Sequence, residues 1–177
     1  PYGIKSKKTV IEYSIKNTQF LINKGCDLIV IACNTASAFA YDILRKKFNV
    51  PIFNVIDSGV SAVKDSGIRN IGIIATPSTI DSKTYANRLK KVKNIKKIIS
   101  NQCPIFVPIV EEGLKPKGYI DQIISENLNI FKKNKIDGLI LGCTHYPILK
   151  GKIKKFLGPN VKIFDSSVEI AKTIKIQ

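Results

Sequence analysis

The sequence predicts an α/β protein with mostly parallel sheets, because strand-like apolar runs alternate with helical patterns along its 177 residues. Two of these runs, residues 28–32 and 139–142, each lead directly to a cysteine and then to small polar residues. Uninterrupted apolar runs of this kind predict strands that are buried on both faces. In open parallel sheets, ligands bind just beyond the carboxyl ends of the strands. The chain therefore builds one kind of site twice, with the thiols of Cys33 and Cys143 at the two centres.

The order of the elements follows from the spacing of the apolar residues and from the turn residues between them. We expect strands at residues 27–32, 52–56, 70–75, 95–100, 137–142 and 161–164. We expect helices at residues 5–24, 36–48, from 57, 77–91, 119–133, 148–157 and from 166.

Capping and turn residues fix several helix ends. Gly25 suits the C-cap of the first helix. Asp57 or Ser58 is the expected N-cap of the third helix, and Thr76 of the fourth, with a proline in its first turn. Segment 103–108 contains two prolines, so we expect it to be extended rather than part of a central strand.

The composition of the chain argues against two classes of partner, membranes and nucleic acids. No apolar run approaches the roughly 18 residues of a membrane helix, so we expect a cytoplasmic protein without a membrane partner. The formal net charge of +16 favours a nucleic-acid partner, but only three of the 29 basic residues are arginines, and the lysines are spread along the chain. Arginine and interleaved aromatic residues are what base or phosphate recognition prefers. We therefore expect no nucleic-acid partner, and a basic nucleic-acid-binding α/β module stays as the alternative from a different class.

The four cysteines form no Cys-x-x-Cys pair and show no Cys/His spacing that suits zinc, so we expect no metal. Cys26 and Cys103 are interpreted as buried packing residues. Cys33 and Cys143 differ because each stands between a strand and a helix, where free backbone N–H groups and the helix dipole favour the thiolate. We expect these two thiols to be reactive.

His145 is the only histidine and lies two residues after Cys143. Imidazole titrates near neutrality and can exchange protons with the adjacent thiol or with a substrate. No histidine lies near Cys33, so the two halves differ chemically, and a partner for Cys33 has to be a carboxylate or come from outside this chain.

The other turn residues supply hydroxyl, amide and helix-start N–H groups that suit small carboxylates. They are Asn34, Thr35, Ser37, Thr76, Thr79 and Thr144. No glycine-rich phosphate loop is present, and we expect no organic cofactor.

Four segments together resemble the glutamate racemase family, within the aspartate/glutamate racemase superfamily. They are residues 1–3 (Pro-Tyr-Gly), 32–37 (Ala-Cys-Asn-Thr-Ala-Ser), 106–113 (Phe-Val-Pro-Ile-Val-Glu-Glu-Gly) and 142–147 (Gly-Cys-Thr-His-Tyr-Pro). The resemblance implies two similar domains, each with a mostly parallel sheet flanked by helices, and an active site in the cleft between them. We place the first domain at residues 1–56 plus 165–177 and the second at residues 57–164.

The resemblance also implies a function. Members of the family interconvert L- and D-glutamate without pyridoxal phosphate or metal, and they supply D-glutamate for peptidoglycan. By resemblance, Cys33 and Cys143 are the two catalytic bases, one for each face of the substrate α-carbon, and Glu111 and His145 support proton transfer. The residues implied in substrate contact are Tyr2, Gly3, Asn34, Thr35, Thr76, Thr79, Thr144 and His145. We expect a homodimer with glutamate as its small-molecule substrate.

The chain departs from the family pattern at its ends. Family members begin with a strand and an Asp-Ser-Gly loop that supplies a catalytic aspartate beside the first cysteine. Neither is present here, so we expect a fragment that lacks this segment and part of the C-terminus. Asp57-Ser58-Gly59 repeats the letters after the second strand and is not assigned that role. Aspartate racemase of the same superfamily is the near alternative, although the Pro-Tyr-Gly and Val-Glu-Glu-Gly segments favour glutamate.

Overall fold

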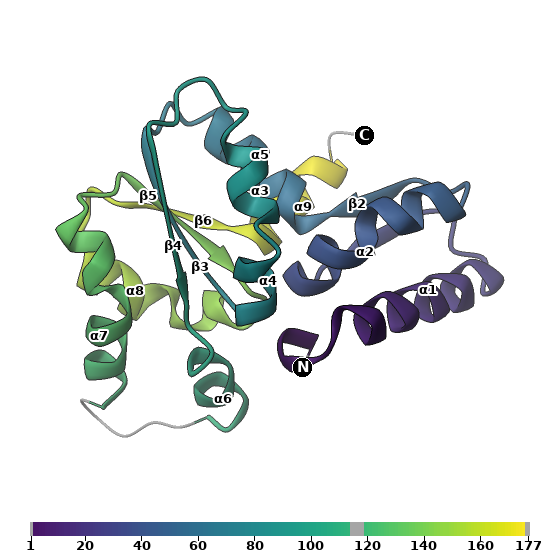
Figure 1. Ribbon diagram of the computed structural model, residues 1–177, viewed down its shortest axis with the longest axis horizontal. Coiled ribbons are helices and arrows are strands. Elements are labelled where there is room, and N and C mark those ends of the chain that lie inside the picture. Colours follow the sequence, from purple (N-terminus) through teal and green to yellow (C-terminus); the bar gives the residue numbers. More distant parts are fainter. Residues whose placement is uncertain (1, 114–118, 176–177) are drawn as a thin grey trace.

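The structure is a computed structural model that describes residues 2–113 and 119–175 (Figure 1). Pro1 of the Pro-Tyr-Gly segment and the last two residues of the predicted first domain lie outside the described residues. The described strands form two parallel sheets, one with the order β1-β2 and one with the order β4-β3-β5-β6. The strands are β1 (Ile29–Ile31), β2 (Ile52–Asn54), β3 (Asn70–Ala75), β4 (Lys97–Gln102), β5 (Gly138–Gly142) and β6 (Lys162–Asp165). The predicted α/β class with parallel sheets and flanking helices is confirmed.

Helices connect the strands and cover the sheets. The α-helices are α1 (Lys7–Asn23), α2 (Asn34–Lys47), α3 (Val55–Lys64), α4 (Pro77–Asp81), α5 (Thr84–Leu89), α6 (Phe106–Glu111), α7 (Tyr119–Lys133), α8 (Lys150–Leu157) and α9 (Ser166–Lys175). Two short 3₁₀-helices are η1 (Tyr2–Ile4) and η2 (Tyr146–Leu149). None of the helices described here is both long and apolar enough to cross a membrane.

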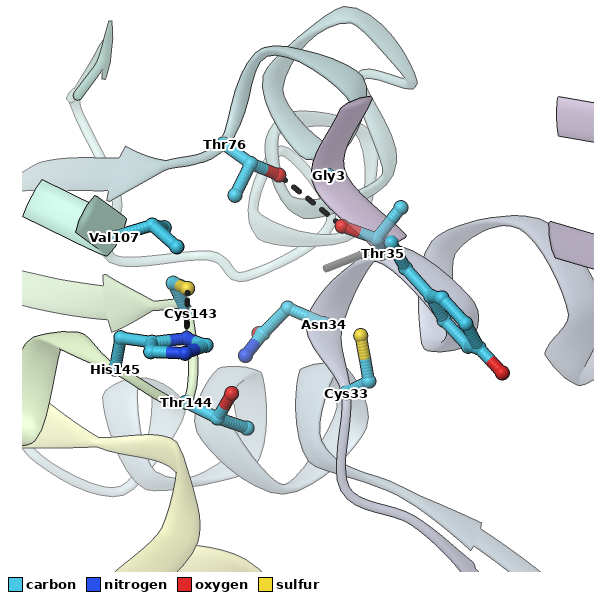
Figure 2. A pocket seen from close by; sticks show the side chains of 11 residues that line it. Gly3, Cys33, Asn34, Thr35, Thr76, Val107, Cys143, Thr144 and His145 are labelled. Atoms are coloured by element: carbon cyan, nitrogen blue, oxygen red, sulfur yellow. Dashed lines mark hydrogen bonds between the residues drawn. The ribbon is translucent and has the colours of Figure 1, made fainter. Parts of the chain in front are cut away.

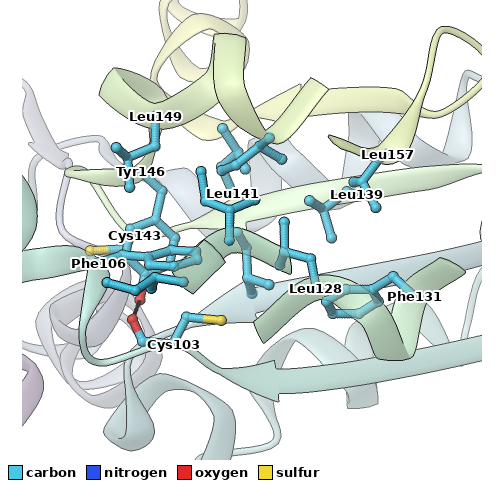
Figure 3. Packing of buried hydrophobic residues seen from close by; sticks show 14 of the residues in the cluster. Cys103, Phe106, Leu128, Phe131, Leu139, Leu141, Cys143, Tyr146, Leu149 and Leu157 are labelled. Atoms are coloured by element: carbon cyan, nitrogen blue, oxygen red, sulfur yellow. Dashed lines mark hydrogen bonds between the residues drawn. The ribbon is translucent and has the colours of Figure 1, made fainter. Parts of the chain in front are cut away.

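The four-stranded sheet has a hydrophobic core on each face. Leu139 and Leu141 of β5 point to one face and pack with side chains of α6, α7 and α8 (Figure 3). Ile140 points to the other face, where side chains of α3 and α5 cover it. Because every residue of β5 is buried, the predicted two-face burial is confirmed for this strand. Strand β5 therefore holds Cys143, which follows it, on a rigid support.

The two-face prediction is wrong for β1. Ile29 and Ile31 pack against α1 and α2, but Val30, which points to the opposite face, is 37% exposed. In the described residues, β1 pairs with β2 alone, whereas β5 is paired on both of its edges. The Cys33 half of the molecule therefore has a smaller core than the Cys143 half.

Two of the expected elements have a different form. Segment 106–111 is the helix α6 rather than an extended segment. Pro108 stands in its first turn, where a backbone N–H would have no partner within the helix, so proline is tolerated there. The expected helix 77–91 is two helices, α4 and α5, because Lys83 between them adopts the left-handed φ of 56°.

Several helix ends are also shifted from expectation. Helix α2 begins at Asn34, with Cys33 as its N-cap residue. The N-cap of α3 is Asn54 rather than Asp57 or Ser58, since the Asn54 side chain accepts from the backbone N–H of Asp57. At the end of α1 the cap is Lys24, and Gly25 follows it with the left-handed φ of 89°.

Helices α3 and α9 lie side by side where the two halves meet (Figure 1). The Thr173 hydroxyl of α9 donates to the Ser58 hydroxyl of α3 at 3.2 Å. The predicted division between residues 56 and 57 falls inside α3, whose Ile56 and Val63 belong to the core of the larger sheet. The domain limits remain a prediction.

Candidate active site

The two cysteine turns face one cleft between the halves of the molecule (Figure 2). The cleft encloses about 320 Å³ of unoccupied space, its open mouth included. Its walls are Tyr2, Gly3, Cys33, Asn34, Thr35, Thr76, Val107, Gly142, Cys143, Thr144 and His145. The structure thus brings together nine of the residues proposed from the sequence, with Cys33 and Cys143 on opposing walls.

Cys33 belongs to the wall formed by the start of α2. It is half-buried, and the next two residues, Asn34 and Thr35, are buried in the first turn of the helix. The Ser37 hydroxyl donates to the backbone carbonyl of Cys33 at 2.8 Å and to that of Ile31 at 3.1 Å. These bonds fix the turn between β1 and α2, so that the thiol faces the cleft.

Cys143 is buried, and this changes the expected state of its thiol. The pKa of Cys143 is raised to about 11, chiefly by burial, and the charges of Cys33 and Glu111 act in the same direction. Hydrogen bonds from the His145 backbone N–H and the Thr144 hydroxyl lower the pKa without cancelling the effect of burial. The expected thiolate is therefore wrong for Cys143 in this structure, where the neutral thiol is favoured.

His145 connects Cys143 to a carboxylate. Its Nδ1 lies 3.6 Å from the Cys143 Sγ, and its Nε2 lies 3.0 Å from the Glu111 Oε1 at the end of α6. Glu111 does not line the cleft itself and contacts it through the imidazole. With Nε2–H donating to the carboxylate, Nδ1 keeps a free lone pair that can accept a proton from the thiol. Glu111, His145 and Cys143 thus form one path for a proton.

Three buried threonine hydroxyls form a closed ring beside the cleft. The Thr35 hydroxyl lies 3.1 Å from that of Thr76 and 3.0 Å from that of Thr79, and the last two lie 3.0 Å apart. Thr35 belongs to the first half, whereas Thr76 and Thr79 belong to the second. Thr79 does not line the cleft and supports the two threonines that do. The ring places hydroxyl groups from both halves at one end of the cleft.

Close packing explains the glycines of the site. A Cβ at Gly3 would lie 2.7 Å from the Thr76 Cγ2, so η1 can approach α4 only without a side chain. The Ser78 hydroxyl secures this approach by donating to the Gly3 carbonyl at 2.8 Å. At Gly142 a Cβ would lie 2.9 Å from the backbone oxygen of Ile74. Both glycines therefore allow backbone to form part of the cleft wall.

Sequence reasoning missed four residues of the site. Val107 and Gly142 line the cleft, and buried Tyr85 and Ser166 hold the Asn34 side chain from outside it. Gly142 directly precedes Cys143 in the Gly-Cys-Thr-His-Tyr-Pro motif, and this position could have identified it as a residue of the site. Val107 was not recognised as a cleft residue because residues 103–108 were expected to be extended, whereas Val107 lies in helix α6.

The remaining sequence candidates lie away from the cleft. Cys103 is buried, as expected, and burial raises the pKa of its thiol to about 12. Cys26 is exposed in the turn between α1 and β1, so its interpretation as a packing residue is wrong. Asp57 pairs with Arg88 of α5 and takes no part in the cleft. In the part of the chain that the structure describes, no group of three or more His, Cys, Asp or Glu residues could hold a metal ion.

Comparison with known proteins agrees with this geometry. The family model described as Asp/Glu/Hydantoin racemase matches residues 5–174. A glutamate racemase of Aquifex pyrophilus is 49% identical over 168 residues, which are 94% of this chain and 65% of that protein. The chain thus spans about two thirds of the length of this curated relative.

Solved structures show the same relationship. A glutamate racemase of Francisella tularensis in complex with D-glutamate is 40% identical with a TM-score of 0.90, over 99% of this chain and 66% of that one. An aspartate racemase of Picrophilus torridus is 25% identical with a TM-score of 0.70, over 94% of this chain and 68% of that one. The resemblance seen in the motifs is confirmed. The chain belongs to the Asp/Glu/Hydantoin racemase family.

Proposed function

We propose that the protein containing this chain is a glutamate racemase that needs no cofactor and uses Cys33 and Cys143 as opposed acid and base. The observation that carries the proposal is the placement of the two thiols on opposite walls of one cleft, each supplied by its own half. Inversion at an α-carbon removes a proton from one face and returns one to the other. Two groups that each exchange one proton, facing each other across the substrate, are the minimum for this reaction.

The protonation state of the site supports unequal roles for the two thiols. A charge on Cys33 raises the pKa of Cys143, so the two thiols resist ionising together. In each direction one thiol has to be the base while the other is the acid. Neutral Cys143 is ready to donate its proton. For the reverse direction it first has to lose that proton, and His145, whose Nε2 is bonded to Glu111, is placed to accept it.

The polar walls supply hydrogen-bonding groups for a substrate with two carboxylates. Hydroxyls of Thr35, Thr76 and Thr144, the amide of Asn34 and the free N–H groups at the start of α2 face the same space. D-glutamate is the molecule bound in the related Francisella tularensis enzyme. Glutamate is favoured over aspartate because identity and structural similarity are both higher to the glutamate racemase of Francisella tularensis than to the aspartate racemase of Picrophilus torridus.

The biological setting forms part of the same proposal and follows from family resemblance. We place the enzyme in the cytoplasm as a homodimer that supplies D-glutamate for peptidoglycan, without a nucleic-acid partner. Nucleic-acid binding by the basic surface would fall steeply with salt, so a filter-binding titration at low and high salt tests that alternative.

Incubation of the full-length protein with L-glutamate, without added cofactor, tests the activity. We expect optical rotation to fall to zero as the mixture becomes racemic, and L-aspartate to lose its rotation far more slowly. A variant lacking both thiols, Cys33→Ser with Cys143→Ser, is the control. Faster conversion of aspartate would assign the related substrate, and unchanged rotation of both amino acids would remove the racemase proposal.

A further inference from the structure

The side-chain amide of Asn34 is held from outside the cleft by hydrogen bonds to two buried residues, Tyr85 and Ser166. The Tyr85 hydroxyl of α5 donates to the Asn34 Oδ1 at 2.7 Å. On the other side, the Asn34 Nδ2 donates to the Ser166 hydroxyl of α9 at 3.5 Å. All three residues are only 2% exposed. Asn34 of α2 is thus held on one side by Tyr85 from the second half and on the other by Ser166 from the C-terminal helix α9.

The hydrogen-bond network permits only one orientation of this amide. The Ser166 hydroxyl donates to the backbone carbonyl of Leu141 at 3.3 Å, and a carbonyl can only accept. Ser166 can therefore only accept from Asn34, which places the amide nitrogen on the Ser166 side and the oxygen on the Tyr85 side. Burial raises the pKa of Tyr85 well above its ordinary value, so its hydroxyl keeps the proton that it donates.

Tyr85 also lies close to the backbone that leads to the other cysteine. A Cβ at Gly142, the residue before Cys143, would lie 3.3 Å from the Tyr85 Cε2. A Cβ at Gly59 of α3 would lie 3.6 Å from its hydroxyl oxygen. The phenol ring thus reaches from the backbone beside Cys143 to the residue that follows Cys33.

We propose that Tyr85 is a positioning residue that fixes the Asn34 amide so that its NH₂ group, rather than its oxygen, is offered to a substrate carboxylate. Asn34 lines the cleft, and its amide end points into the space between the two cysteines (Figure 2). An NH₂ group donates to a carboxylate oxygen, whereas an amide oxygen in its place would repel it. Without the phenol hydroxyl, the buried Oδ1 loses its donor, and only the 3.5 Å bond to Ser166 still holds the amide in this orientation. This role rests on the proposed racemase function.

The test is the steady-state kinetics of Tyr85→Phe in the full-length protein with both glutamate enantiomers. We expect KM to rise about ten-fold in both directions, the effect of one lost hydrogen bond to a charged group, while kcat changes less than about three-fold. Tyr146→Phe is the matched control, since Tyr146 is also fully buried and its hydroxyl donates to the Cys103 carbonyl at 2.7 Å. The Tyr146→Phe variant loses a hydrogen bond of similar length, so we expect it to be less stable but to keep the KM of the parent enzyme.

A double-mutant cycle separates positioning from a general structural effect. If Tyr85 acts through Asn34, then Tyr85→Phe should leave KM unchanged in a background that carries Asn34→Ala. Should Tyr85→Phe fail to fold, Asn34→Asp keeps the bond from Tyr85 and replaces only the NH₂ group, and its KM should rise at least as much. Unchanged KM in Tyr85→Phe or Asn34→Asp, or a full further effect of Tyr85→Phe on Asn34→Ala, would overturn the role of Tyr85. Absence of racemisation by the parent enzyme would instead overturn the proposed function.

Discussion

Replacement of either cleft thiol should nearly abolish racemisation. We expect Cys33→Ser and Cys143→Ser each to lower kcat/KM by about 10³-fold or more, towards the upper end of what one general acid–base group contributes. Serine is almost isosteric with cysteine, but its hydroxyl is far too weak an acid to ionise near neutral pH. Polarimetry with each glutamate enantiomer measures the loss.

The other two cysteines are internal controls for this result. Cys26→Ser alters an exposed thiol, and Cys103→Ser alters a buried one that packs in the core beside Phe106 (Figure 3). Both should retain their rate, and Cys103→Ser should lose stability in urea unfolding. Near-normal turnover by Cys33→Ser or Cys143→Ser would exclude the two-thiol mechanism.

His145→Asn should affect the two directions of the reaction unequally. The imidazole is needed only where Cys143 has to give up its proton before it acts as the base, because burial holds that thiol in the neutral form. We expect kcat in that direction to fall by about 10²-fold or more, the usual contribution of one positioned acid–base group. The equilibrium constant between enantiomers stays at unity, so any difference in kcat must be matched by an equal difference in KM.

Glu111→Gln gives a second measure of the same proton path. It keeps a side chain of the same size beside the Nε2 of His145 but removes the charge that stabilises the imidazolium. Its effect should point in the same direction as that of His145→Asn and should vanish when both substitutions are combined. Equal losses of kcat in both directions would show that His145 only positions the substrate.

Local patterns were sufficient to predict the parts of the site that depend on local sequence. The apolar run before Cys143 is a fully buried strand, and the thiol follows it as expected. The run before Cys33 is also uninterrupted and apolar, yet Val30 is 37% exposed, because burial depends on neighbouring elements that the run itself does not specify. For the same reason burial, rather than the helix dipole, decides the pKa of Cys143.

Contacts between distant residues were beyond the reach of sequence patterns. Tyr85 bonds to Asn34 across 51 positions, and Thr35 joins a hydroxyl ring with Thr76 and Thr79 across more than 40. Nothing in the local spacing of these residues marks them as partners. Pro108 contributed to the wrong prediction of an extended segment at residues 103–108. Proline argues against a central strand, but it is equally acceptable in the first turn of a helix, where Pro108 lies.

The central claim is that one thiol removes the α-proton of glutamate and the other returns a different proton to the opposite face. Racemisation of L-glutamate in deuterium oxide tests this directly, with mass spectrometry of both enantiomers at early conversion. We expect the D-glutamate formed to carry deuterium at its α-carbon, because the thiol that donates has already exchanged with solvent, while the remaining L-glutamate stays unlabelled. D-glutamate that keeps the original protium would show that a single group moves the proton between faces, and would contradict the account.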